Sequence, residues 1–177
     1  MAQAKKRKRF FEVDMPILGK ETDLQAYEQK EIGGRIINYD LTRSLKGKSM
    51  ILQLEVKAEK ENLVAHPIQA KVLPYFLRRM IRKGTNYVED SFIVQCENSK
   101  ARIKPFLITR RKVSRAVRKA LREKAKEEIL NYVKDKTTDE IFDDIIKSKI
   151  QRELSSKLKK IYPLSLCEIR IFKVEKK

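Results

Sequence analysis

Residues 108–133 carry two interleaved repeats, one apolar and one cationic, and no other feature restricts the possible folds as much. The apolar repeat advances by steps of three and four, so its members fall on one face of an α-helix: Val113, Val117, Ala120, Leu121, Ala125, Ile129 and Val133. The cationic repeat advances in the same way and falls on another face: Arg111, Arg115, Arg118, Arg122 and Lys126. The segment therefore predicts a long helix that packs on a hydrophobic core and presents concentrated positive charge.

The positive charge of this segment has almost no compensation. Between residues 108 and 126 there are nine Lys and Arg residues and one acid, Glu123. Without acids at the i+4 positions, like charges on a helix repel one another. The whole chain repeats the imbalance, with 42 Lys and Arg against 24 Asp and Glu and a net charge of +18. Nucleic acid is the commonest polyanion that could neutralise this excess, so we interpret the stripe as a phosphate-binding surface; a solvated face is the alternative.

Two further segments are strongly basic. Lys5–Arg9 reads KKRKR, and we expect this arm to be disordered until RNA orders it, although a solvated tail without a role is the other reading. Residues 74–83 predict a short helix that begins at Pro74, ends at Gly84 and has a wholly cationic polar face. Its apolar face consists of Phe76, Leu77, Met80 and Ile81.

These basic segments supply the candidate RNA-binding residues. They are Lys5, Lys6, Arg7, Lys8, Arg9, Arg78, Arg79, Arg82, Lys83, Arg110, Arg111, Lys112, Arg115, Arg118, Lys119, Arg122 and Lys126. We expect Arg111, Arg115, Arg118 and Arg122 to contact the RNA backbone and not base edges. Aromatic residues make up only 7% of the chain, with no Trp, so a stacking platform for single strands is not expected.

The composition reverses after Lys126. Residues 127–147 contain seven acids and three bases, a net charge of −4. Thr137–Glu140 has the pattern of a capping box and predicts a helix with Ile141, Phe142, Ile145 and Ile146 inside. We expect Asp139, Glu140, Asp143 and Asp144 to form an acidic face that points away from RNA, toward solvent or a basic neighbouring protein.

Strand patterns flank the helices, so the fold class is α+β. Residues 35–41 and 50–56 predict a hairpin around Gly47, and residues 90–97 and 101–109 predict a second hairpin. Residues 62–72 are a weaker candidate, which Pro67 restricts to an edge or a bend. A last strand over 164–174 alternates, since Leu166, Glu168, Arg170 and Lys173 fall among Cys167, Ile169, Ile171 and Val174. We expect an arm of residues 1–9 and one domain of residues 10–177, strand-rich over 33–109, helical over 110–162 and closed by the strand 164–174.

No catalytic constellation stands out. His66 is the only histidine, and neither Cys96 nor Cys167 belongs to a CxxC pair, so a metal site is not supported and we expect no cofactor. The GKS at 47–49 lacks the first glycine of a phosphate-binding loop and leads into a strand pattern. The chain shows neither 18 consecutive apolar residues nor a signal peptide, so we expect a cytosolic protein that is not an enzyme and has no membrane partner.

Several segments resemble one protein family. They are KRFFEVDMP near the start, GRIINYDL at 34–41, FLRRMIRKGTNYVEDSF at 76–92, ITRRKVSRAVRKALREK at 108–124 and KIYPLSLCEIRIFKV at 160–174. Together and in this order they resemble the S3Ae family of small-subunit ribosomal proteins, called eS1 in unified naming, which archaea and eukaryotes share. The resemblance covers nearly all of the chain from Arg9 onward. The chain ends soon after its last strand, without the C-terminal extension typical of eukaryotic members, which favours an archaeal source.

The resemblance implies a β-barrel-like mixed or antiparallel sheet of about six or seven strands, with three to four helices packed beside it. It implies a structural constituent of the small ribosomal subunit, located in the cytoplasm, on the platform near the mRNA exit and the 3′ end of the small-subunit rRNA. The implied partners are that rRNA, neighbouring small-subunit proteins, and mRNA near the exit. Two alternatives stay open: a non-catalytic RNA-binding subunit of an RNA-processing enzyme, and a free-standing RNA chaperone.

Overall fold

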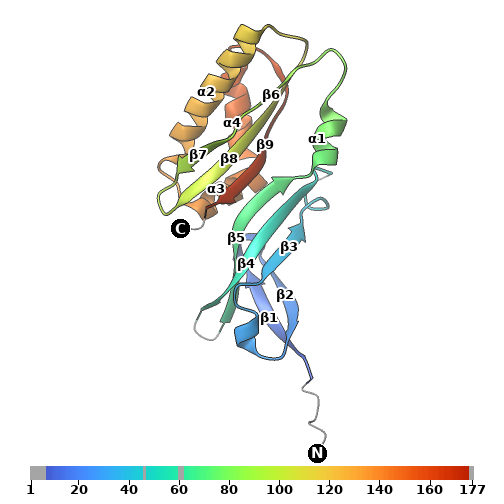
Figure 1. Ribbon diagram of the computed structural model, residues 1–177, viewed down its shortest axis with the longest axis vertical. Coiled ribbons are helices and arrows are strands. Elements are labelled where there is room, and N and C mark those ends of the chain that lie inside the picture. Colours follow the sequence, from blue (N-terminus) through green and yellow to red (C-terminus); the bar gives the residue numbers. More distant parts are fainter. Residues whose placement is uncertain (1–6, 46, 60–61, 176–177) are drawn as a thin grey trace, which may run out of the picture. The chain divides into compact units, whose positions relative to one another are not determined.

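The computed structural model describes residues 7–45, 47–59 and 62–175 (Figure 1). Four helices follow and interrupt a series of strands, so the α+β class is confirmed. The strands are β1 (Arg9–Met15), β2 (Lys20–Ala26), β3 (Ile36–Asp40), β4 (Met50–Glu59), β5 (Asn62–Val72), β6 (Tyr87–Glu89), β7 (Phe92–Gln95), β8 (Lys100–Thr109) and β9 (Leu164–Val174). The helices are α1 (Pro74–Met80), α2 (Arg115–Val133), α3 (Thr138–Ile146) and α4 (Lys149–Leu158), and two 3₁₀ turns cover Pro16–Leu18 and Gln29–Glu31.

The strands form one mostly antiparallel sheet. Its main order is β2-β1-β5-β9-β8-β6, while β4 also pairs with β5, β3 with β4, and β7 with β8. Among the described residues the sheet has nine strands, not six or seven, and it stays open instead of closing into a barrel. Both expected hairpins are confirmed, as β3 with β4 and β7 with β8, and the last strand has the predicted bounds.

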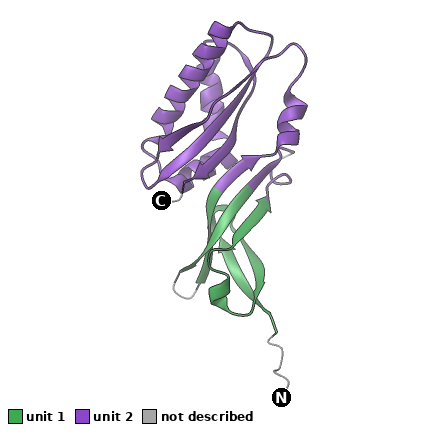
Figure 2. Ribbon diagram, viewed as in Figure 1, with its two compact units in different colours: residues 1–39, 52–68 green, residues 40–51, 69–177 purple. Residues whose placement is uncertain are grey.

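The chain divides into two compact units (Figure 2). The first comprises residues 1–39 and 52–68. Within it, β1 and β2 form an antiparallel hairpin that pairs from Arg9 with Ala26 to Met15 with Lys20. Gly19 closes the hairpin turn with a φ of 58°, a conformation that costs glycine little. Val13, Met15, Ala26, Leu52 and Leu54 form much of this unit's buried interior.

The second unit comprises residues 40–51 and 69–177, and its centre is β8. Strand β9 pairs along one edge of β8, from Ala101 with Val174 to Thr109 with Leu164. Strands β6 and β7 pair along the other edge. Helix α2 packs against β6 and β7, while α3 and α4 pack against β9. The unit's core therefore lies between β8 and β9 on one side and these three helices on the other.

Two prolines lie inside long strands, at points where the ladder is irregular. Of the two possibilities that Pro67 left for β5, an edge or a bend, the edge is wrong, because β5 pairs with β1, β4 and β9. Pro67 falls between the pairing of Val64 with β1 and the pairing of Gln69–Lys71 with β9. Pro105 lies at a register shift between β8 and β9. A proline lacks the N–H that a continuous ladder requires, so these positions tolerate it.

The same register shift changes which residues of β9 are buried. Lys104 pairs with Ile171 and Pro105 with Ile169, so Arg170 is an extra residue on β9. A bulge of this kind reverses the alternation of side chains beyond it. Phe172 is fully buried and contacts Phe142 of α3 edge-on, with ring centroids 4.8 Å apart. Ile171 and Val174, by contrast, are only half-buried.

Helix α2 begins later than the cationic repeat predicts. Ser114 caps it by accepting a hydrogen bond from the N–H of Val117, so Arg111 precedes the helix instead of lying on it. The apolar face is confirmed from Leu121 onward: Leu121, Ala125, Ile129 and Val133 are buried. Helix α1 is also shorter than expected. It ends at Met80, and Ile81 is exposed.

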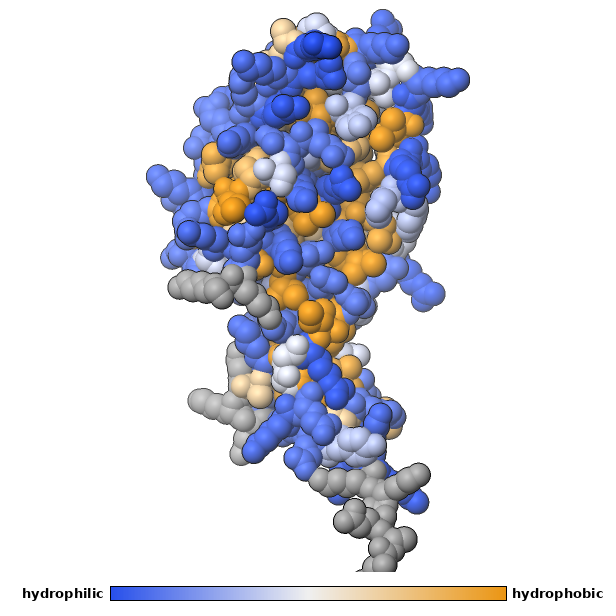
Figure 3. All heavy atoms as spheres, in the orientation of Figure 1, coloured by the Kyte–Doolittle hydropathy of each residue, from blue (hydrophilic) through white to orange (hydrophobic). Residues whose placement is uncertain are grey.

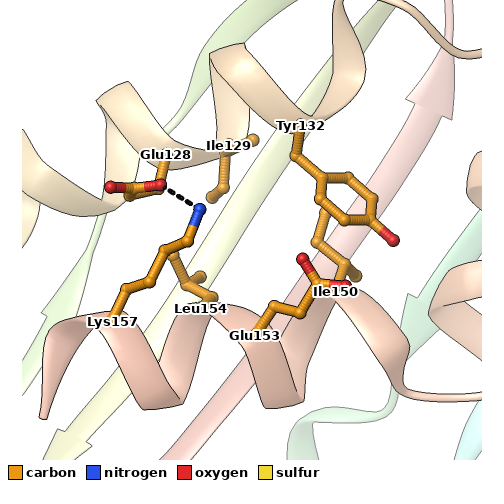
Figure 4. Close-up of a pocket in the computed structure, with 7 residues that line it drawn as sticks. All are labelled: Glu128, Ile129, Tyr132, Ile150, Glu153, Leu154 and Lys157. Atoms are coloured by element: carbon orange, nitrogen blue, oxygen red, sulfur yellow. Dashed lines mark hydrogen bonds and ion pairs between the residues drawn. The ribbon is translucent and has the colours of Figure 1, made fainter.

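Helices α2 and α4 pack closely against each other (Figure 4). Ile129, Ile150 and Leu154 are buried, and the space left beside them has a volume of only about 10 Å³, room for a water molecule at most. Above this contact the Nζ of Lys157 lies 2.6 Å from an Oε of Glu128 (Figure 4). The hydrogen bond from Lys157, followed by that from Lys124, holds the pKa of Glu128 below its usual value.

A buried acid connects helices α2, α3 and α4. Asp144 of α3 is 5% exposed, although the sequence pattern placed it on an acidic surface. Its carboxylate lies 2.6 Å from the Nζ of Lys136 and 3.2 Å from the Nζ of Lys149, and it accepts a hydrogen bond from Tyr132 of α2. Burial alone would raise the pKa of Asp144, but the hydrogen bonds from Lys136, Tyr132 and Lys149 outweigh burial and lower it.

The substitution Asp144→Asn should lower the free energy of unfolding by about 1–3 kcal/mol, because it leaves partly buried donors without their charged acceptor. Asp143→Asn is the matched control on the same helix. Asp143 pairs with Lys147 where both side chains are at least 39% exposed, so its loss should change stability by about 0.5 kcal/mol or less. Urea unfolding of both variants gives the comparison; equal losses would contradict a structural role for Asp144.

The effect of Asp144→Asn should also depend on pH. A carboxyl whose pKa is lowered by folding contributes stability above its unfolded value, here the ordinary 3.8, and loses it as the pH falls through the folded value. The stability difference between the natural chain and the variant should therefore be constant above pH of about 5 and shrink as the pH falls below 3.8. Unfolding curves between pH 2 and 7 measure this, and a difference that widens on acidification would contradict it.

Candidate nucleic-acid interface

The cationic repeat forms one surface on α2, which we call the α2 cationic face. It consists of Arg115, Arg118, Lys119, Arg122 and Lys126. All are exposed except Arg118, which is half-buried. Arg110, Arg111 and Lys112 are exposed in the loop directly before the helix. Eight of the seventeen candidate residues therefore belong to one continuous stretch of chain around the beginning of α2.

The other candidate residues lie elsewhere. Arg78 and Arg79 are exposed on α1, with Arg82 and Lys83 in the turn that follows, and Figure 1 shows α1 well apart from α2. Arg7, Lys8 and Arg9 are exposed at the start of the first unit, while Lys5 and Lys6 lie outside the described residues. Hydrophilic residues cover most of the molecular face seen in Figure 3, so polarity alone does not distinguish a site.

The arginines of the α2 cationic face have no acidic partners. Within the described ranges, the side chains of Arg115, Arg118 and Arg122 make no ion pair and no hydrogen bond. The Nε atom of Arg118 is buried and has no acceptor. Lys119 has only an exposed and long pairing with Glu123, at 3.8 Å. The exposed donors of Arg115, Lys119 and Arg122 are therefore available to an external anion.

The C-terminal half of the same helix is different. Lys124 pairs with Glu127 at 3.0 Å and with Glu128 at 3.2 Å, and these hydrogen bonds raise the pKa of Lys124. Glu128 also forms a second ion pair, with Lys157 of α4. Acids and bases are thus matched inside the fold near the end of α2, while the bases near its beginning are not.

The helix dipole adds to this contrast. The first turn of α2 contains Arg115 and no acid, and Arg118 and Lys119 follow directly. Cations at a helix N-terminus are unfavourable by about 0.3–1 kcal/mol each, because the backbone N–H groups there already carry partial positive charge. An anion at this end would interact favourably with both the helix and its arginines. The arrangement costs stability in the free chain and suits phosphate.

A buried hydroxyl fixes the beginning of α2 to the sheet. Thr109, which is fully buried, accepts a hydrogen bond from the N–H of Asn86 at 3.0 Å and donates to the carbonyl of Arg111 at 2.7 Å. The Asn86 side chain in turn accepts a hydrogen bond from the N–H of Val113 at 2.9 Å. The sequence analysis did not single out either residue, because a Thr and an Asn 23 positions apart carry no signal of pairing. Their bonds hold β6 and the start of α2 in a fixed relation.

The predicted acidic face does not exist as a single surface. Asp144 is buried in its ion pairs, Asp143 pairs with Lys147, and Glu140 accepts a hydrogen bond from the N–H of Thr137 in the capping box. The capping box itself is confirmed. Among the four acids, Asp139 alone is exposed without a side-chain partner in the described part of the chain. The acids of this region mainly stabilise the fold.

Comparison with known proteins identifies the family. The model of the Ribosomal S3Ae family matches residues 3–177. The chain belongs to this family. It is also 26% identical over 183 residues to the small ribosomal subunit protein eS1 of Nanoarchaeum equitans (strain Kin4-M), covering 96% of this chain and 90% of that protein. The resemblance seen in the sequence is confirmed, and an archaeal relative agrees with the expected source.

Membership of the S3Ae family assigns the chain a general role. It is a ribosomal protein, a structural and non-enzymatic component of the small ribosomal subunit that takes part in translation. It associates with rRNA and with other small-subunit proteins. Over the described residues, no helix is both long and apolar enough to cross a membrane.

Proposed function

We propose that this S3Ae protein binds the phosphate backbone of small-subunit rRNA through the α2 cationic face and the loop that precedes it. The arginines of α1, the turn at Arg82 and Lys83, and the arm at Lys5–Arg9 supply further contacts. The family resemblance supports a place on the platform, near the mRNA exit and the 3′ end of the rRNA, in cytoplasmic ribosomes. In that position mRNA near the exit is a further partner.

The observation that carries this proposal is the set of three α2 arginines without acidic partners. Packing of Leu121, Ala125 and Ile129 on the sheet holds the helix, so the arginines lose little freedom on binding. A guanidinium group presents planar, paired donors that match phosphate oxygens. A-form RNA offers phosphates and 2′-hydroxyls more readily than base edges, which suits recognition of shape by a rigid cationic face.

The acidic surface that could contact a neighbouring protein is smaller than the sequence predicted, because only some of the acids in this region are exposed and unpaired. Asp135, Asp139 and Glu140 are exposed between α2 and α3 and at the start of α3. RNA repels them, so this part of the second unit faces solvent or a basic neighbouring protein.

Changing Arg111, Arg115, Arg118 and Arg122 together to Gln should weaken the salt dependence of RNA binding. If each arginine neutralises one phosphate, the slope of log K against log salt should fall by about 3, at about 0.7–0.9 per phosphate. The fold should survive, because Gln is a comparable helix former and the changes spare the buried face. Affinity for a small-subunit rRNA transcript is measured over a series of salt concentrations, with circular dichroism as the check on folding.

A variant with the same change in charge is the control. Lys134, Arg152, Lys159 and Lys160 are exposed cations at the end of α2, on α4 and just after it. Changing these four to Gln should leave most of the slope intact. Equal losses from both variants would mean that binding depends on net charge and not on the α2 cationic face.

Sedimentation distinguishes the ribosomal role from the two alternatives. A stable constituent should remain with small subunits in a cell lysate through a wash in high salt, since many contacts and protein neighbours hold it. An RNA chaperone or the RNA-binding subunit of a processing enzyme should instead appear mainly in free or smaller complexes. Recovery of most of the protein away from small subunits at low salt would contradict the proposal.

A further inference from the structure

The sheet of the second unit has one face that the helices cover and one face that they do not. In this part of the sheet, β9 pairs with both β5 and β8, and β7 pairs with the other edge of β8. Directly paired residues point to the same face, so the register assigns each side chain to a face. Ile103 of β8 pairs with Phe172 of β9 and with Phe92 of β7, and all three are buried on the side of the helices. The neighbouring positions on these strands therefore point to the opposite side.

These neighbouring positions form a surface that we call the open sheet face. It consists of Gln69 and Lys71 of β5, Ile93 and Gln95 of β7, Lys100, Arg102 and Lys104 of β8, and Ile171 and Lys173 of β9. Every one of them is exposed or half-buried. Ala70, Val94 and Ala101, which alternate with them on the same strands, are buried. The open sheet face is therefore accessible to a partner.

The open sheet face carries five cations and no acid. Arg102 lies directly opposite Lys173, a pairing of like charges that is unfavourable in a sheet. An ion pair with Glu175, at 2.8 Å, neutralises Arg102. The four lysines, in contrast, make neither an ion pair nor a hydrogen bond with any described residue: Lys71, Lys100, Lys104 and Lys173. Three neighbouring strands thus present unpaired positive charge on one surface.

Acids lie at one border of the open sheet face, where β6 ends. Glu89 is already paired with Arg170, at 3.0 Å. Asp90 follows it and lines a hollow of about 310 Å³ together with Lys104. Asp90 makes no ion pair within the described ranges. One unpaired carboxylate at this border does not balance four free lysines, so the surface stays positive.

The chemistry of the open sheet face suits an RNA backbone better than a protein neighbour. Lysine is under-represented in protein interfaces, and its compact ammonium group is strongly hydrated. Most contacts from proteins to nucleic acid, in contrast, go to phosphate and sugar, and lysine is one of the residues that make them. The nine residues include no aromatic ring on which a base could stack. Contact with phosphates is therefore the interaction that this surface supports.

We propose that the open sheet face binds the phosphate backbone of a second RNA segment, so that the second unit joins two segments of the rRNA. Helix α2 packs against β6 and β7, and the Nζ of Lys126 lies 5.7 Å from the centre of the Phe92 ring on the covered side. The α2 cationic face and the open sheet face thus belong to opposite sides of one sheet. This inference rests on the proposed function, which supplies the first segment, and extends it.

A bridging experiment tests the second surface. Two short RNA hairpins, one with a donor dye and one with an acceptor dye, are mixed with the full natural chain at equal concentrations. Energy transfer between the hairpins should appear, and a large excess of protein should abolish it, because each hairpin then occupies its own chain. The loss with excess protein separates bridging from aggregation.

The variant removes the four free lysines by combining Lys71→Gln, Lys100→Gln, Lys104→Gln and Lys173→Gln. It should lose the energy transfer and still bind one hairpin with a salt-dependent affinity. On an rRNA transcript, its slope of log K against log salt should fall by about 3, at about 0.7–0.9 per phosphate. The matched control is the variant with Gln at positions 134, 152, 159 and 160, which should keep the transfer. Circular dichroism and thermal unfolding establish that both variants are folded.

Lysine acetylation of the natural chain gives a second measurement that needs no variant. An acetylating reagent is applied with and without a saturating rRNA transcript, and modified lysines are quantified by mass spectrometry. RNA should protect the four lysines of the open sheet face, as well as Lys119 and Lys126 of the α2 cationic face. Lys134, Lys159 and Lys160 lie outside both surfaces and should be modified as in the free chain.

The possible failures can be told apart. If RNA protects Lys119 and Lys126 but not the open sheet face, or if the fourfold lysine variant still bridges hairpins, the second surface binds no RNA and the proposed function stands. If the open sheet face is protected in purified small subunits but not by rRNA alone, a protein neighbour covers it, which also overturns the inference. If RNA protects neither surface and binds without dependence on salt, the proposed function itself fails.

Discussion

The antiparallel pairing of β8 with β9 is the interaction on which the rest of the second unit depends. Strand β8 uses both of its edges, with β9 on one and β6 and β7 on the other, and its residues Pro105–Thr109 are all buried. The helices have a hydrophobic surface to pack on only because these strands are together. The pairing of β8 with β9 thus determines where the arginines of α2 lie, although those arginines are not part of either strand.

Helix α2 tolerates its positive charge because the groups that stabilise the fold and the arginines that repel one another lie in different halves of the helix. Its buried face and its matched acids lie toward the C-terminal half, where Glu127 and Glu128 have lysine partners and Asp144 connects the helices. The N-terminal half carries repelling arginines at the unfavourable end of the dipole. Stability and binding are therefore assigned to different ends of one element, and a change at either end should leave the other largely intact.

Local patterns in the sequence predicted those features that depend on neighbours in the chain. The apolar face of α2 from Leu121 onward, the capping box at Thr137 and Glu140, and the bounds of β9 were correct, because helical spacing, a cap and strand alternation are read within a few residues. Asp144 was misplaced because its partners Tyr132, Lys136 and Lys149 come from three segments.

Features set by distant pairing had little or no local signal. The burial of Phe172 depends on a bulge that only the pairing with β8 reveals. Strand β6 has three residues, too few for alternation to show, so the sequence did not predict it. The β1–β2 hairpin was missed as well: Val13 and Met15 alternate visibly on β1, but β2 is polar except for Leu24 and Ala26 and is held by its partner.

The position of β9 has a consequence for the way the protein is made. In the sheet it lies between β5 and β8, yet it is synthesised after the other eight described strands. Until it leaves the exit tunnel, β5 and β8 each have an unpaired edge, which other chains could join. The arginines of α2 emerge earlier, beside a sheet that is still incomplete. A nascent chain in this state combines two open strand edges with a highly basic helix, and the arrival of β9 closes both edges at once.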